Sequence, residues 1–204
     1  GVQTCALPIS MTPCPWPGVV DLATAPWRID AFELWVVLNS RFFVCGDSGP
    51  YLLALLAGVP CVSVNTIRLG YNTIGSNDLY IVKRVFDRVH KRFLSIAEMF
   101  SDEFVHGRVD FNRFEWVDNT PEEIREAVED MVDRLAAPSR PRTPEQRRHD
   151  ELLSQIVPRL SASGRAQPSL LARRGGRGTL SPRFAARYFD SASADRLEHG
   201  HRMS

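Results

Sequence analysis

The sequence predicts an α/β fold, a Rossmann-like parallel sheet with flanking helices, followed by an arginine-rich and partly disordered tail. The main indication is the stretch 41–65, RFFVCGDSGPYLLALLAGVPCVSVN, which has the pattern of strand, tight loop, helix, turn and strand. A capping box at Thr120–Glu123 opens a second helix, and the apolar run Leu79–Val82 indicates a third strand. Strands that alternate with helices in this way are typical of a parallel sheet covered on both faces.

Each break within the stretch 41–65 has a physical reason. Arg41–Cys45 is aromatic and β-branched, and it is short enough for one buried strand. The next four residues, 46–49, bend easily because two of them are glycine, and Pro50 suits the first turn of a helix. Tyr51–Ala57 is almost wholly apolar, which predicts a buried helix, and Gly58 fits the left-handed position that ends one. The loop therefore faces a helix N-terminus at a carboxyl strand end, a place that attracts anions.

The segments before this unit are predicted to be an extended start, a short strand and a helix. Gly1–Ile9 resembles a translated sequencing adapter, so we exclude it from the fold and expect upstream protein to be missing; a native flexible N-terminus is the alternative. Ser10–Gly18 is proline-containing and extended, and Val19–Leu22 is predicted to be a strand. Asp30 is predicted to cap an apolar-rich helix over 31–40 that lies against the sheet.

A long polar loop follows the second strand, from Asn65 to Asp78, and such a loop is uncommon in a compact domain unless it has a function. Because it leaves a carboxyl strand end, we expect it to flank the same crevice as the loop 46–49. Arg68 can pair with a phosphate, Asn77 and Asp78 can form hydrogen bonds with a polar ligand, and Lys83 can neutralise negative charge. The alternatives are solvated cations at the first and last positions and an Asx-turn at the other two.

The rest of the chain is predicted to complete the domain and then become mobile. Between Asp87 and Val117 we expect His90 in an exposed loop, a short helix capped by Ser95, irregular chain over 102–112 and a strand over 113–117. The helix after Thr120 has an apolar stripe for the sheet: Ile124, Val128, Met131, Val132 and Leu135. A further helix begins after Thr143 and is expected to stop at Pro158, and Ser181–Asp190 is expected to be a weakly ordered helix. The predicted divisions are residues 1–9, 10–135 (the domain), 136–160 (linker and helix), 161–180 (flexible), 181–190 (helix) and 191–204 (tail).

Composition excludes several classes of protein. The 204 residues, 44% hydrophobic and 24% charged, are typical of one globular domain, and the net charge of +1 combines an acidic front with an arginine-rich back. No apolar run approaches the ~20 residues that cross a bilayer. The four cysteines have neither CxxC nor metal-ligand spacing, which favours a reducing, cytoplasmic compartment and no metal. The short arginine run 173–177 lacks interleaved aromatic residues, so we expect no nucleic-acid partner.

The motifs RFFVCGDSG, AGVP and GSNDLYIVK together resemble the C-terminal, donor-binding half of a bacterial glycosyltransferase family with the GT-B architecture of two Rossmann-like domains. The similarity extends over most of the chain, and the first two motifs are the specific ones. It implies sugar transfer from an activated, nucleotide-linked donor, with no cofactor. It also implies that acceptor binding belongs to a missing N-terminal domain, so that this chain alone is inactive.

The resemblance implies a donor site whose residues come from the two loops and the strand that follows them. These are Asp47, Ser48 and Gly49 at the diphosphate, with Asn65, Arg68, Asn77, Asp78 and Lys83 around the crevice. Capping of the helix by Asp47 or Ser48 is the structural alternative. The glutamate pair of retaining relatives is missing between Gly46 and Pro60, which favours an inverting reaction, and no catalytic base is assigned. Two other functions stay open: a non-catalytic module that binds a nucleotide or phosphorylated metabolite, and a protein-interaction domain that acts through the basic tail.

Overall fold

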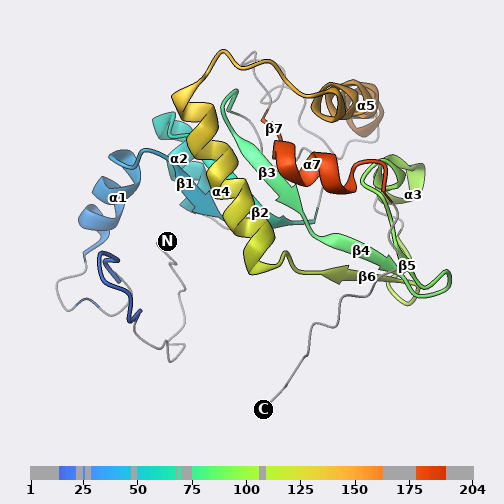
Figure 1. The fold of residues 1–204 in the computed structure, drawn as a ribbon, viewed down its shortest axis with the longest axis horizontal. Coiled ribbons are helices and arrows are strands. Elements are labelled where there is room, and N and C mark those ends of the chain that lie inside the picture. Colours follow the sequence, from blue (N-terminus) through green and yellow to red (C-terminus); the bar gives the residue numbers. More distant parts are fainter. Residues whose placement is uncertain are drawn as a thin grey trace.

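The computed structural model describes residues 14–21, 25, 29–46, 50–67, 69, 75–105, 109–162 and 178–191, and over 156–162 only the helical backbone. Within these residues the chain forms an α/β fold with a four-stranded parallel sheet and a three-stranded antiparallel sheet (Figure 1). The predicted fold class is confirmed to this extent, since helices flank the parallel sheet as they do in Rossmann-like folds.

The parallel sheet has the strand order β1-β2-β3-β7. Its strands are β1 (Phe43–Cys45), β2 (Cys61–Thr66), β3 (Leu79–Val82) and β7 (Thr179–Leu180). The register pairs Phe43 with Cys61 and Leu79 with Thr179. All four residues of β3 are buried, as expected of a central strand that is covered on both faces. The predicted βαβ unit is thus confirmed, whereas β7 falls in a segment that was predicted to be flexible.

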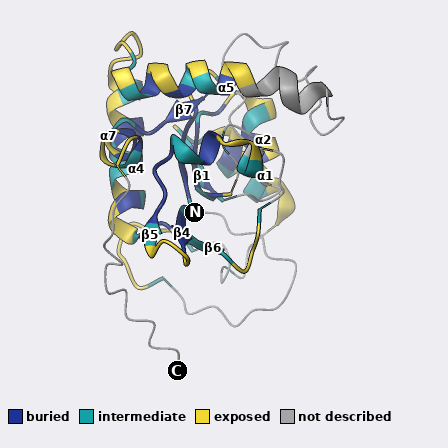
Figure 2. Cartoon of the chain, turned by 90° about the vertical axis from the view of Figure 1, so that its right-hand side faces the viewer, coloured by how far each residue is buried: buried dark blue, intermediate teal, exposed yellow. Residues whose placement is uncertain are grey.

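Helices lie on both faces of the parallel sheet. The described helices are α1 (Asp30–Leu38), α2 (Pro50–Ala57), α3 (Asp102–Val105), α4 (Pro121–Ala136), α5 (Pro144–Ala162) and α7 (Pro182–Tyr188). Figure 2 shows α4 and α7 on one side of the strands, α1 and α2 on the other, and α5 across one end. The capping box of α4 is confirmed, because Thr120 and Glu123 each accept a hydrogen bond from the backbone N–H of the other. Its apolar stripe is only partly buried: Val132 is exposed, while Glu123 and Asp130 are buried.

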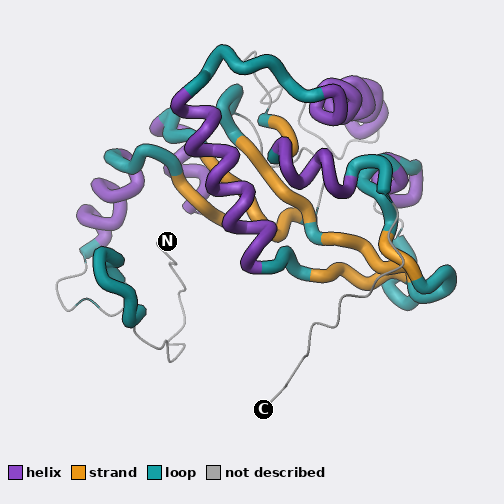
Figure 3. The backbone as a smooth tube through the Cα atoms, viewed as in Figure 1, coloured by secondary structure: helices purple, strands orange, loops and turns teal. Residues whose placement is uncertain are grey.

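A small antiparallel sheet continues from the carboxyl end of the parallel one. It has the order β5-β4-β6 and consists of β4 (Arg84–Asp87), β5 (Arg92–Phe93) and β6 (Phe114–Val117). The chain passes from β3 into β4 with only Lys83 between them (Figure 3). The 3-10 turn η1 (Glu98–Phe100) and α3 connect β5 to β6, so the segment 102–112 is not wholly irregular as predicted. Ala97 rather than Ser95 is the N-cap of this turn, although the side chains of Ser95 and Glu98 each accept a hydrogen bond from the other's backbone N–H.

The C-terminal helix α7 is docked on the domain, so the prediction that it is weakly ordered is wrong. Phe184 and Phe189 are 3% and 0% exposed, and α7 packs against α4 and α5. Arg183 pairs with Asp130 on α4 at 2.9 Å. The sequence argument failed because the apolar side of α7 looked too small to fold alone, whereas it meets a surface that α4, α5 and β7 build together.

Three further expectations for helices and strands are wrong. Residues 19–21 form no strand, and Val20 is exposed. Ile29 rather than Asp30 is the N-cap of α1, and α1 packs on α2. The backbone of α5 continues through Pro158 to Ala162, since one proline removes a single helical hydrogen bond without ending every helix.

The helix α2 is not buried on all sides, contrary to the prediction from its apolar sequence. Tyr51 and Ala54 face the sheet and are buried. Leu52, Leu53 and Leu56 point away from it and are exposed. An all-apolar helix shows no polar face in its sequence, so the pattern alone could not reveal which side the sheet covers.

Candidate functional site

The carboxyl ends of the parallel strands lie along one edge of the sheet, which we call the carboxyl edge. Gly46 follows β1, Ile67 follows β2, and Lys83 follows β3. The helix α2 begins at Pro50, so its N-terminus also lies at this edge. Asp47, Ser48 and Gly49, which were predicted to contact a diphosphate, lie outside the described residues. The described part of the edge nevertheless has the βαβ geometry that the prediction required.

Asn65 gives the carboxyl edge an unusual backbone geometry. Its φ of 55° places it in the left-handed region, which few residues other than glycine adopt and which asparagine tolerates better than most. The pairing between β2 and β3 shifts register between Ser63 and Thr66, so the ladder is irregular at this point. Irregular strand ends and left-handed residues are frequent next to binding sites, because they redirect the chain that follows.

Asn65 is held in this conformation by Asn119, which lies in the connection between β6 and α4. The N–H of Asn65 donates to Oδ1 of Asn119 at 2.7 Å, and the N–H of Asn119 donates to Oδ1 of Asn65 at 2.6 Å. The Nδ2 group of Asn119 also donates to the carbonyl of Val82 at 2.8 Å. This buried asparagine therefore ties together the ends of β2 and β3 and the start of α4.

Lys83 brings a positive charge to the same edge. Its backbone N–H donates to the carbonyl of Thr66 at 2.8 Å, which fixes the point where the chain leaves β3. Its Nζ lies 2.5 Å from Oδ1 of Asp118, the residue that precedes Asn119. The structure thus brings Asn65 and Lys83 together with two residues that the sequence analysis missed, Asp118 and Asn119.

Asn77 and Asp78 lie at the opposite, amino edge of the sheet, because they immediately precede β3. The carboxylate of Asp78 is buried and accepts hydrogen bonds from the N–H of Cys61 at 3.0 Å and of Gly75 at 2.8 Å. Burial raises the pKa of Asp78, although these hydrogen bonds oppose the shift. The side chain of Asp78 joins the loop before β3 to the start of β2. The structure therefore does not bring these two residues to Asn65 and Lys83, and Arg68 lies outside the described residues.

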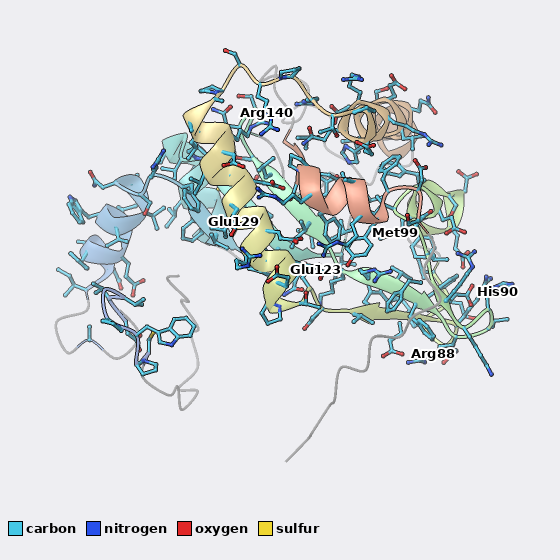
Figure 4. All side chains as sticks on the ribbon, viewed as in Figure 1. Arg88, His90, Met99, Glu123, Glu129 and Arg140 are labelled. Atoms are coloured by element: carbon cyan, nitrogen blue, oxygen red, sulfur yellow. The ribbon has the colours of Figure 1, made fainter. Side chains whose placement is uncertain are left out.

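Two other clusters of titratable side chains have structural roles. Asp87 accepts hydrogen bonds from His90 and Arg113 at the end of the small sheet, and Figure 4 places Arg88 and His90 there, at the far end from α1. Arg113 holds the pKa of Asp87 well below its usual range. His149 bonds Tyr80 and Asp150, but both rings are buried, so a substrate cannot reach them. The cluster around Asp87 stabilises the hairpin of β4 and β5, and the cluster around His149 stabilises the contact of α5 with the sheet.

Of the residues predicted to form the site, the structure describes Asn65 and Lys83 at the carboxyl edge. Among the described residues, no group of three histidine, cysteine or acidic side chains is placed to hold a metal ion. None of the helices that the structure describes is both long and apolar enough to cross a membrane. Comparison with protein-family models, curated proteins and solved structures gives no match for this chain.

Proposed function

We propose that the carboxyl edge binds the diphosphate of a nucleotide-linked sugar, and that the chain is the donor-binding part of a glycosyltransferase. The observation that carries this proposal is the unit β1-α2-β2, in which a short glycine-containing connection leads from the end of β1 to the N-terminus of α2. Free N–H groups and the helix dipole favour anions at such a place. Lys83 adds a full positive charge at the neighbouring strand end.

In this proposal the chain binds and polarises the donor and performs no proton transfer itself. Transfer breaks the bond between the anomeric carbon and the diphosphate oxygen, so negative charge develops on the leaving diphosphate. The N–H groups at the start of α2 and the ammonium of Lys83 stabilise that charge more strongly in the transition state than in the bound donor. The base that activates the acceptor belongs to another part of the enzyme, as the family resemblance implies.

A second candidate is a non-catalytic module that binds a nucleotide or a phosphorylated metabolite through the same edge. One observation favours it: the described acidic side chain beside Lys83 is Asp118, which is engaged in an ion pair instead of being available as a base. The two candidates differ in whether the sugar contributes to binding. A binding module recognises the nucleotide part alone, while a transferase also contacts the sugar.

Calorimetric titration with nucleoside diphosphates and the corresponding nucleotide-sugars separates these candidates. We expect at least one nucleotide-sugar to bind, and to bind more tightly than its nucleoside diphosphate. Gly49→Val and Lys83→Met should each weaken binding at least tenfold, because they obstruct approach to the loop backbone and remove the cation. The control Ser76→Ala changes an exposed side chain at the amino edge and should leave binding unchanged.

Equal affinity for both ligand classes would favour the binding module. Unchanged binding in folded Gly49→Val and Lys83→Met would place the ligand away from the carboxyl edge. Sugar transfer to an acceptor by the isolated chain would contradict the proposal that the base lies elsewhere.

A further inference from the structure

The ion pair of Lys83 and Asp118 is asymmetric in its exposure to solvent. The aspartate side chain is 69% exposed and the lysine side chain 25%. A solute that approaches the carboxyl edge therefore meets the carboxylate more readily than the ammonium group. Lys83, the cation of the proposed donor site, is therefore already paired with Asp118, whose carboxylate is negatively charged as a phosphate is.

Both members of the pair are attached to backbone that the sheet holds in place. The N–H of Lys83 is bonded to Thr66 of β2. Asp118 is covalently next to Asn119, which is clamped to Asn65 and Val82. The carboxylate is thus presented to Lys83 by a fixed connection between β6 and α4, and its position does not depend on a mobile loop.

An ion pair this exposed is easily exchanged. Water and salt screen the two charges, so such pairs add little to stability and their loss costs little. A diphosphate offers more charge and more acceptor oxygens than one carboxylate, so it competes with Asp118 for the ammonium group of Lys83. A singly charged anion gains nothing comparable when it replaces a carboxylate that is already held in position.

We propose that Asp118 is a built-in counter-ion, which occupies Lys83 while the site is empty and which the diphosphate of the ligand displaces. The inference rests on the proposed donor site and adds a selectivity device to it. Asp118 lowers the affinity of the edge for every anion and so restricts occupancy to ligands with several phosphate contacts. Its removal should strengthen binding, which is the opposite of what loss of an ordinary binding residue does.

The test compares the wild-type chain with Asp118→Asn by calorimetry, with inorganic pyrophosphate and uridine diphosphate as probes. We expect Asp118→Asn to bind both probes about fivefold more tightly at low salt, with a smaller gain at high salt, since the competing charge is gone. Asp118→Ser should give the same gain, and Lys83→Met should lose binding. The matched control Asp190→Asn removes one exposed carboxylate from a pair with Arg148 and should not change the affinity. Circular dichroism verifies that each variant is folded.

The outcomes separate the inference from the function on which it rests. Tighter binding by both Asp118 variants, or binding that appears only in them, supports the proposal that Asp118 is a counter-ion. Binding by the wild type that is unchanged or weaker in these variants overturns the counter-ion and leaves the donor site intact. Absence of binding in the wild type and in both variants overturns the counter-ion and the anion site together. An equal gain in Asp190→Asn would show a general charge effect and would also overturn the inference.

Discussion

At the scale of single residues, a polar contact between α5 and the sheet joins Tyr80, His149 and Asp150. The carboxylate of Asp150 can only accept, so Nδ1 of His149 carries the proton and lies 3.0 Å from it. Nε2 of His149 then accepts from the Tyr80 hydroxyl. Burial, together with the charge of Arg142, lowers the pKa of His149 from 6.5 to about 3. The imidazole therefore stays neutral in the folded protein at every pH near neutrality.

This histidine predicts how stability depends on pH. Between pH 6.5 and about 3 the unfolded chain takes up a proton at His149 and the folded chain does not. Stability should therefore fall as the pH drops below 6.5, by up to about 1.4 kcal/mol per pH unit from this group. His149→Gln, whose amide can still bond Tyr80, should remove that contribution. Urea unfolding at pH 7.5, 6 and 5 measures it, and an equal pH slope in both proteins would show that the histidine is not held neutral.

The contact between Asn65 and Asn119 shows why residue-scale prediction was incomplete. Asn65 was predicted as a site residue from the family resemblance and from the polar loop that it begins, and the structure places it at the carboxyl edge. Its partner stands 54 positions later in the sequence, and a single sequence contains no signal that joins them. The polar pair 118–119 directly before a capping box was the available hint. Asn77 and Asp78 were assigned to the site because they belong to the loop that leaves β2 at the carboxyl edge. The loop is long enough to cross to the amino edge before β3 begins, and the sequence does not show where it crosses.

At the scale of elements, strong local signals succeeded and weak ones failed. The β1-α2-β2 unit and α4 were predicted because glycine, proline and the capping box fix their ends through local backbone chemistry. The two-residue strand β7 and the helix α7 were missed as parts of the core, because short elements gain their stability from tertiary contacts. The small sheet was missed in part because β5 has only two residues.

The docking of α7 can be tested through Arg183. Its guanidinium pairs with buried Asp130, whose pKa burial raises, and with Asp133. Arg183→Met should lower the free energy of unfolding by about 1–2 kcal/mol, since a buried carboxylate loses its charged partner but keeps two hydrogen bonds. Hydrogen exchange should show 181–190 protected in the wild type and less protected in the variant.

The matched control for this prediction is Arg125→Met on α4. Arg125 pairs with Glu122 and Glu129, and all three side chains are about half exposed. Pairs of this kind contribute roughly 0–1 kcal/mol, so the control should change stability by less than Arg183→Met. Exchange of 181–190 at the unprotected rate in the wild type would contradict the docked position of α7.

At the scale of the whole molecule, β1, β2, β3 and β7 form one parallel sheet with one carboxyl edge. The segment 178–191, far along the sequence, supplies both the last described strand and a helix that packs beside α4 (Figure 1). The fold class followed from the alternation of strands and helices. The addition of β7 at the edge of the sheet could not be predicted from the sequence, because no sequence pattern marks a two-residue strand. The proposed function depends on ligand binding at the carboxyl edge, and such binding can be measured directly.

The central claim is that ligands bind at the carboxyl edge, and chemical-shift mapping tests it most directly. In a ¹⁵N-labelled sample titrated with nucleotide-sugars, we expect the largest amide shifts at Gly46, Asn65, Lys83 and Asn119. Amides of the amino edge, such as Asp78, and of the hairpin, such as His90, should shift little. Shifts concentrated at the amino edge or the hairpin, or no shifts with any nucleotide-sugar at millimolar concentration, would contradict the claim.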